Sequence, residues 1–89
     1  MPVISMFYGI IIRMFLIDTK QHNLPHIHAK YGDFEAVITI DSGEIVDGRL
    51  PARVLGLVQE WRENHRTELT EDWNLSRERK ALKRIKPLE

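Results

Sequence analysis

The stretch that decides the fold runs from residue 26 to residue 40 and reads HIHAKYGDFEAVITI. Apolar and polar side chains alternate on both sides of Gly32-Asp33, which is the pattern of two half-buried strands joined by a tight turn. Glycine in the first turn position indicates a type II′ turn, because glycine adopts the positive φ of that position at little cost. The alternation therefore predicts a β-hairpin from His26 to Ile40.

A turn at Gly32-Asp33 also fixes which residues face each other. Tyr31 lies opposite Phe34, Lys30 lies opposite Glu35, and opposed residues share a face of the hairpin. The predicted apolar face carries Ile27, Ala29, Tyr31, Phe34, Ala36, Ile38 and Ile40. The predicted polar face carries His26, His28, Lys30, Glu35, Val37 and Thr39. We expect the apolar face to be the core side, which leaves the polar face as the candidate functional surface.

The chain before the hairpin is apolar and rich in β-branched residues. Met1–Ile12 is interpreted as strand rather than as a secretory leader or membrane span, since it lacks a basic start and Arg13 interrupts it. Gly9–Ile17 is predicted to be the first strand. One of its faces carries Ile10, Ile12, Met14 and Leu16.

Turn and helix signals follow the hairpin. Residues 41–44 predict a turn, residues 45–46 a short strand, and Asp47-Gly48 a second turn. Pro51 suits the first position of a helix. Apolar residues then recur at helical spacing, at Leu50, Val54, Leu57, Val58 and Trp61. This stripe is expected to cover the apolar face of the hairpin.

The C-terminal third predicts two helices rather than one, at about 51–65 and 68–80, with Thr67 as the cap of the second. Gly56 suggests that the first helix approaches the sheet closely. Leu82–Leu88 is predicted to return as an edge strand. These elements give an α+β fold, an antiparallel sheet of three to five strands with two helices packed on one face.

The length and composition indicate one small globular domain, residues 1–89. A chain of this size buries only roughly 60–65% of its unfolded surface, so a homodimer or docking on a partner would add useful burial. The absence of cysteine excludes disulfides, thiolate metal sites and a cysteine nucleophile. We expect a cytoplasmic protein without a cofactor and without membrane attachment.

Charge is unevenly distributed, although the net charge is zero. The last sixteen residues hold six basic and two acidic groups, so a +4 tail balances a −4 body. The basic residues are Arg77, Arg79, Lys80, Lys83, Arg84 and Lys86. Such a tail suits RNA or another polyanion. It equally suits the end of a helix, where cations interact favourably with the macrodipole.

His26 and His28 carry the most informative chemistry. At positions i and i+2 of a strand they point the same way, with Cα atoms ~6.6 Å apart. Imidazole titrates near neutral pH, so the pair suits the base and acid of metal-independent RNA cleavage, with Arg13 and Lys30 over the phosphate. In that interpretation the catalytic candidates are His26, His28 and Arg13. A metal site would need another ligand from outside the hairpin, such as His22, His65 or a carboxylate. The alternatives to catalysis are that the histidines make structural hydrogen bonds or belong to a partner interface.

Other conspicuous residues have simpler interpretations. Trp61 and Trp73 at helical spacing are predicted to be core anchors, and His65 a partly buried residue of the core or of a helix end. Lys30 and Glu35 suit a cross-strand ion pair. The sequence contains no phosphate-binding glycine loop, nucleophile elbow or zinc-finger spacing.

Several segments together resemble a known bacterial family. They are Ile4–Ile10, Ile12–Phe15, Pro25–Gly32, Asp41–Ile45, Leu50-Pro51, Trp61, His65, Leu69, Trp73 and Ile85–Leu88. The set is similar to domain-of-unknown-function family 4160 over essentially the whole chain, and Pro-His-x-His-Ala is its most specific part. The family assigns no catalytic residue, so none carries over. His22 lies in a longer Lys20–Leu24 insert.

The resemblance implies a setting rather than a reaction. Genes of such proteins often sit beside another small gene, and some members are labelled toxin–antitoxin components or regulators. We therefore expect one component of a toxin–antitoxin-like pair acting on or with RNA, or a non-catalytic regulator that binds a partner or nucleic acid. A metal-binding module is the third alternative. The candidate binding residues are Lys30, Glu35, Tyr8, Arg79, Lys80, Lys83 and Arg84. The expected partners are a small protein from a neighbouring gene and RNA.

Overall fold

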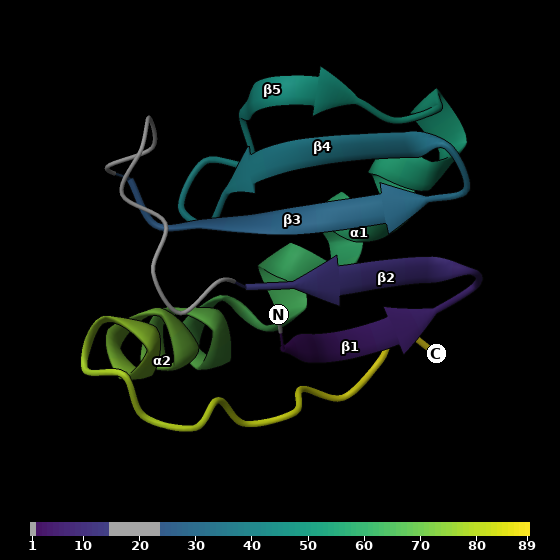
Figure 1. Cartoon of the computed structure of the whole chain (residues 1–89). Coiled ribbons are helices and arrows are strands. Elements are labelled where there is room, and N and C mark those ends of the chain that lie inside the picture. The colour runs from purple at the N-terminus through teal and green to yellow at the C-terminus, as the bar shows by residue number, and fades with distance from the viewer. Residues whose placement is uncertain (1, 15–23) are drawn as a thin grey trace.

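The computed structural model describes residues 2–14 and 24–89. Within these residues, five antiparallel strands form one sheet in the order β1-β2-β3-β4-β5, and two helices follow (Figure 1). The elements are β1 Val3–Phe7, β2 Ile10–Arg13, β3 His26–Tyr31, β4 Phe34–Thr39, β5 Ile45–Arg49, α1 Ala52–Asn64 and α2 Arg66–Arg77. In Figure 1, α1 passes behind the sheet and α2 lies beyond the end of β2. The predicted α+β fold is confirmed.

The predicted hairpin is present with the predicted register. Tyr31 pairs with Phe34, and Lys30 pairs with Glu35. Gly32 opens the turn with a φ of 57°. All seven residues of the predicted apolar face are buried in the core or packed against it. The alternation was a sufficient signal because a shift of one residue would turn this whole set toward solvent.

The strand predicted from Gly9 is present as β2, but it is not the first strand of the sheet. The chain forms a second hairpin there, with β1 paired to β2. The turn consists of Tyr8 and Gly9, whose φ angles of 50° and 78° are typical of a type I′ turn. Tyrosine is not a usual turn residue, which is why the sequence did not indicate this turn. Residues 15–17 of the predicted strand lie outside the described residues.

The last strand is longer than predicted. β5 continues to Arg49, where a second turn at Asp47-Gly48 was expected. Its pairing with β4 shifts register between Val37 and Ile38, as in a β-bulge, and Gly48 has a φ of 74°. Gly48 therefore lies at an irregularity within β5 and does not end the strand.

Two helices are present as predicted, with different boundaries. The two helices are separated by the single non-helical residue His65, so Thr67 lies inside α2 and does not cap it. Pro51 is the N-cap of α1 rather than its first helical residue. Gly56 is exposed, and a Cβ added there would meet nothing within 4 Å, so the predicted close approach to the sheet is wrong. Neither helix is long and apolar enough to cross a membrane.

The core lies between the sheet and α1. Trp61 is fully buried there, and its ring centroid lies 5.4 Å from that of Phe7. The prediction that Trp61 is a core anchor is confirmed. His65 lies at the helix junction, its ring 5.6 Å from that of Trp61. The core-facing side chains of β2, Ile10 and Ile12, are also fully buried.

Leu82–Leu88 forms no strand, contrary to the prediction. One backbone hydrogen bond joins this segment to the sheet, from the Ile85 N–H to the Ile4 carbonyl at 2.8 Å. Trp61 Nε1 also donates to the Lys86 carbonyl at 2.8 Å. The Lys86 carbonyl, which a strand would use for pairing, is occupied by the Trp61 side chain. Pro87 has no N–H to donate to a neighbouring strand. The segment runs along the outer edge of β1 (Figure 1).

Candidate functional site

The sheet topology places most of the predicted polar site on one face. β2 lies beside β3, and their register pairs Arg13 with His28 and Ile11 with Lys30. Lys30 is in turn opposite Glu35 on β4. Because opposed residues share a face, Arg13, His28, Lys30 and Glu35 lie together on the face opposite the core.

His28 is the more exposed of the two motif histidines. Its side chain is 13% exposed, and its Nδ1 lies 3.9 Å from the Glu35 carboxylate. This contact is an ion pair only when the imidazole is protonated. The described residues show no ion pair between Lys30 and Glu35, although the two are directly opposed. The predicted ion pair between Lys30 and Glu35 is therefore not formed, although the two residues are partners in the strand register, and the Glu35 carboxylate lies near His28 instead.

His26 is buried and contacts α2. Its exposed fraction is 1%. Its Nδ1 lies 2.7 Å from the Leu24 carbonyl oxygen, and since a carbonyl only accepts, the ring nitrogen donates. The ring centroid lies 5.0 Å from that of Trp73 and 5.2 Å from that of His28. These contacts join β3 to α2.

The expectation that the whole polar face is exposed is wrong at this end of the hairpin. Val37 and Thr39 are 6% and 4% exposed, and His26 is buried beside them. Thr39 bonds to the turn that follows β4, through its hydroxyl to Ser42 at 2.7 Å. Of the two histidines, His28 is therefore the one with the more exposed side chain.

The basic residues of the C-terminus form a defined surface feature, which we call the cationic strap, residues 77–86. All six cations are exposed, at Arg77, Arg79, Lys80, Lys83, Arg84 and Lys86. Lys80 Nζ contacts the Glu78 carboxylate at 3.0 Å. The strap follows α2 and passes to the outer edge of β1 (Figure 1). The positively charged side chains of the strap therefore project from a segment whose backbone runs along the rest of the fold.

The strap begins with an unusual helix end. The N–H groups of Arg79 and Lys80 donate to the carbonyls of Ser76 and Leu75, at 3.1 and 2.9 Å, which is the Schellman pattern. Arg79 occupies the left-handed position of this motif with a φ of 60°. That position usually holds glycine, because a Cβ is strained there.

Asp72 anchors the middle of the strap. Its Oδ1 accepts the Lys83 backbone N–H at 2.9 Å, and its exposed fraction is 1%. Oδ2 is buried and has no hydrogen-bond partner among the described residues. Burial raises the pKa of the Asp72 carboxyl, and the hydrogen bond from Lys83 opposes that rise. The carboxylate therefore holds the strap through a backbone group and leaves the Lys83 side chain exposed.

Tyr8 lies apart from these residues. It is 59% exposed at the turn between β1 and β2, and it lines a cavity with residues of α1. The structure thus separates the predicted binding residues into the polar face, the cationic strap and the Tyr8 cavity. No group of three His, Asp or Glu side chains among the described residues is arranged to hold a metal ion. His22 lies outside the described residues.

Sequence reasoning missed two residues on which this arrangement depends. Trp73 was predicted as a core anchor, and its contact with His26 was not foreseen. Asp72 was not considered at all. A signal for Asp72 did exist, because Leu69, Asp72 and Ser76 recur at helical spacing and are all buried. A polar residue on a buried helix face indicates a hydrogen-bonded anchor.

Comparison with known proteins adds one finding. The sequence profile of one family, described as Domain of unknown function (DUF4160), matches residues 9–74. No curated protein and no solved structure matches the chain. The matched range contains the motif histidines, Arg13 and Asp72, and it ends before the cationic strap.

Proposed function

This chain belongs to the DUF4160 family of domains of unknown function, and we propose that it is the RNA-binding component of a toxin–antitoxin-like pair. In this proposal, the cationic strap holds the phosphate backbone of the RNA. The observation that carries the proposal is the exposure of all six strap cations on a backbone fixed by hydrogen bonds.

The fixed backbone matters because flexible tails lose conformational entropy when they bind. Ile85 is buried, and its exposed neighbours Arg84 and Lys86 are thereby held at the surface. The Lys83 amide is held by Asp72. A pre-organised row of cations binds a polyanion with a smaller entropic cost. Phosphate contacts carry no sequence information, so the proposed binding is general for single-stranded RNA.

Burial of His26 favours binding over cleavage. A two-histidine mechanism needs both imidazoles at the phosphate, whereas the His26 ring packs on Trp73 and its Nδ1 donates to Leu24. Arg13, His28 and Lys30 then form a secondary contact surface rather than a catalytic centre.

The test is the salt dependence of RNA affinity. Binding of a fluorescein-labelled single-stranded RNA is followed by anisotropy at several salt concentrations, for the wild-type chain and for Lys83→Gln/Arg84→Gln. Each phosphate contact contributes about −0.7 to the slope of log K against log salt for single strands. The double variant is expected to bind more weakly and to flatten the slope by about 1.4.

The matched control is Arg53→Gln/Arg66→Gln, which removes the same charge from exposed positions of the helices, outside the strap and the polar face. It should leave the slope within error of wild type. Equal losses of RNA affinity in both double variants would mean that only the net charge matters, which would overturn the role of the strap. RNA recovered intact after long incubation is the expected result, and cleavage that His28→Ala abolishes would replace binding by catalysis.

The pairing is tested separately, by expression with and without the adjacent gene. Growth, RNA integrity and co-purification of the two products are scored. We expect a stable complex that survives His28→Ala. An unaltered growth phenotype and separate purification of the two products would contradict pairing without bearing on RNA binding.

A further inference from the structure

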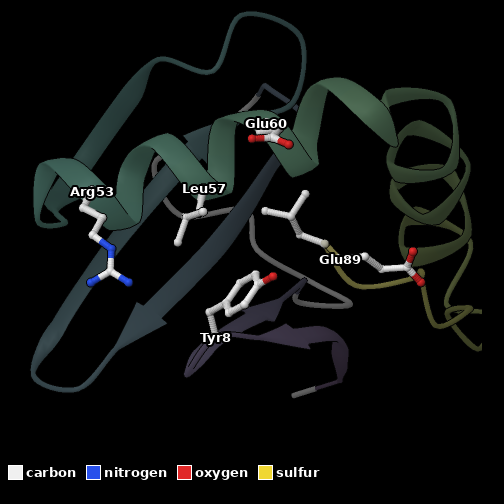
Figure 2. A pocket seen from close by; sticks show the side chains of 6 residues that line it. Tyr8, Arg53, Leu57, Glu60 and Glu89 are labelled. Carbon is white, nitrogen blue, oxygen red and sulfur yellow. The ribbon is translucent and has the colours of Figure 1, made fainter.

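A second site lies away from the strap and the motif histidines. It is a cavity of about 270 Å³ between the turn of the first hairpin, α1 and the end of the chain. Its lining residues are Tyr8, Arg53, Leu57, Glu60, Leu88 and Glu89. Figure 2 shows the Tyr8 ring and the Leu57 side chain at the centre of the cavity, with Arg53 to one side of them and Glu89 to the other.

One wall of the cavity is a single face of α1. Arg53, Leu57 and Glu60 are four and three residues apart, so they lie on the same side of the helix. A rise of 1.5 Å per residue separates the backbones of Arg53 and Glu60 by about 10 Å along the axis. The wall therefore has a cationic end, an apolar middle and an anionic end, where Glu89 adds a second carboxylate.

The charged groups of this wall are not used by the fold. Within the described residues, neither Arg53 nor Glu60 makes an ion pair or side-chain hydrogen bond, although two other arginines of the helices, Arg62 and Arg66, both contact Glu63. Both side chains are exposed. Their charges are thus available to a ligand at no cost in internal contacts.

The opposite wall contains a strained aromatic residue. Tyr8 has a φ of 50°, which a bulky side chain adopts only at a cost, and Asn-Gly is the usual sequence for this type of turn. The residue is 59% exposed instead of filling the core. Strained residues of this kind cluster at ligand sites, where the surrounding structure maintains them. The ring and Leu88 form the apolar side opposite Leu57.

We propose that this cavity binds a small zwitterion with a carboxylate and a primary amine at opposite ends of an aliphatic body. The carboxylate contacts the Arg53 guanidinium, the aliphatic body lies between Tyr8 and Leu57, and the ammonium group contacts Glu60 and Glu89. The volume is slightly below the roughly 300–1,000 Å³ of sites for drug-sized ligands. This size selects a molecule of the size of a basic or ω-amino acid.

The probe is 6-aminohexanoate, added to the ¹⁵N-labelled full chain and followed by amide chemical shifts. We expect saturable shifts at Tyr8, Gly9 and Leu57. Hexanoate and hexylamine each lack one charge, so each should bind at least tenfold more weakly. Shifts confined to other residues, or equal binding of the three probes, would overturn the proposal.

Two variants assign the ends of the ligand. Arg53→Gln should weaken 6-aminohexanoate and hexanoate and leave hexylamine unchanged, whereas Glu60→Gln should weaken 6-aminohexanoate and hexylamine and leave hexanoate unchanged. Both positions are exposed, so neither variant threatens folding. Glu71→Gln, an exposed acid on α2, is the matched control and should change none of the three affinities. An identical response to all probes in both variants would contradict the assigned orientation and the proposal with it.

Discussion

At two positions, Tyr8 and Arg79, the chain places a large side chain on a left-handed backbone. Glycine or asparagine would relieve the strain at each position. Both residues lie at proposed binding sites, the cavity and the cationic strap. At the scale of single residues, the two strained positions therefore coincide with the two proposed binding sites.

Replacing Arg79 by glycine should separate stability from binding. Arg79→Gly is expected to raise the free energy of unfolding by up to about 1 kcal/mol, because glycine adopts this φ without a Cβ clash. Thermal unfolding would then shift upward by about 4–8 °C per kcal/mol. RNA affinity, measured by anisotropy, should fall. Arg79→Ala removes the charge and retains the strain, so it should weaken RNA binding without the rise in Tm. A lower Tm for Arg79→Gly would contradict this explanation.

The two motif histidines should differ in what they contribute to folding. His26→Ala removes a buried ring contact with Trp73 and leaves the Leu24 carbonyl without its donor. The expected loss is about 2–3 kcal/mol in the free energy of unfolding. His28→Ala, at a partly exposed position, should cost under about 1 kcal/mol. Urea unfolding of the two variants measures the difference, and similar losses would assign both histidines the same structural role.

At the scale of elements, α2 both packs against β3 and anchors the strap. Trp73 and Asp72 are consecutive residues of this helix. The first contacts His26 and the second binds the Lys83 amide. The strap is thus attached to the fold by the same helix that buries the motif histidine.

The pH dependence of stability should report the Asp72 anchor. Burial raises its pKa above the unfolded value of 3.8, so the charged form is disfavoured in the folded chain. The resulting loss of stability is present at neutral pH and disappears as the pH falls through the folded pKa. Asp72→Asn removes the charge and keeps an acceptor oxygen for Lys83. It should be more stable than wild type at neutral pH, with a difference that shrinks as the pH approaches about 4 in urea unfolding.

A control for this prediction removes the acceptor as well. Asp72→Ala leaves the Lys83 amide without a partner and should lose about 1–2 kcal/mol over the same pH range. If Asp72→Asn proved less stable than wild type at neutral pH, the ionised carboxylate would be a stabilising anchor instead.

Two glycines in different elements should respond oppositely to alanine. At Gly48 in β5, a Cβ would overlap the Glu35 carbonyl oxygen, and the φ of 74° disfavours any side chain. Gly48→Ala should therefore cost more than about 2 kcal/mol. Gly56 in α1 has open space around it, so Gly56→Ala should stabilise the chain by about 1 kcal/mol. Thermal unfolding of the two variants tests both signs, and a stabilised Gly48→Ala would contradict the bulge.

At the scale of the whole molecule, the charge asymmetry is a property of the folded surface. The strap carries the positive charge along α2 and β1, and the remaining residues balance it to a net charge of zero. Because Ile85 is buried in the shared core, the segment that carries the charge is also part of what holds the fold together.

Truncating Ile85 should therefore destabilise the whole molecule. Ile85→Ala is expected to cost about 2–4 kcal/mol in urea unfolding, in the range of buried isoleucine truncations. Lys86→Ala, at the exposed neighbouring position, keeps the carbonyl that Trp61 binds and should cost less than about 0.5 kcal/mol. Equal and small effects would mean that the strap contributes nothing to the core.

The sequence predicted the elements whose signals are local. Alternation around Gly32-Asp33 gave the central hairpin with its register, and helical spacing gave both helices and the burial of Trp61. The first hairpin was missed because its turn is built from Tyr8, whose type does not indicate a turn. The same local signals placed His28, Lys30 and Glu35 on one face, whereas Arg13 joins them only through the pairing of β2 with β3.

What the sequence determined by itself is the hairpin of residues 26–40 and the concentration of positive charge near the end of the chain. Only the tertiary structure decided that His26 is buried and His28 is not, that the charged tail is a fixed strap, and that Tyr8 faces Arg53 and Glu60 across a cavity. The physical reason is the same in each case. Period and turn chemistry act between neighbours along the chain, whereas burial depends on which distant element packs on a residue. For His26 that element is α2, and for the strap it is Asp72 and the core around Trp61.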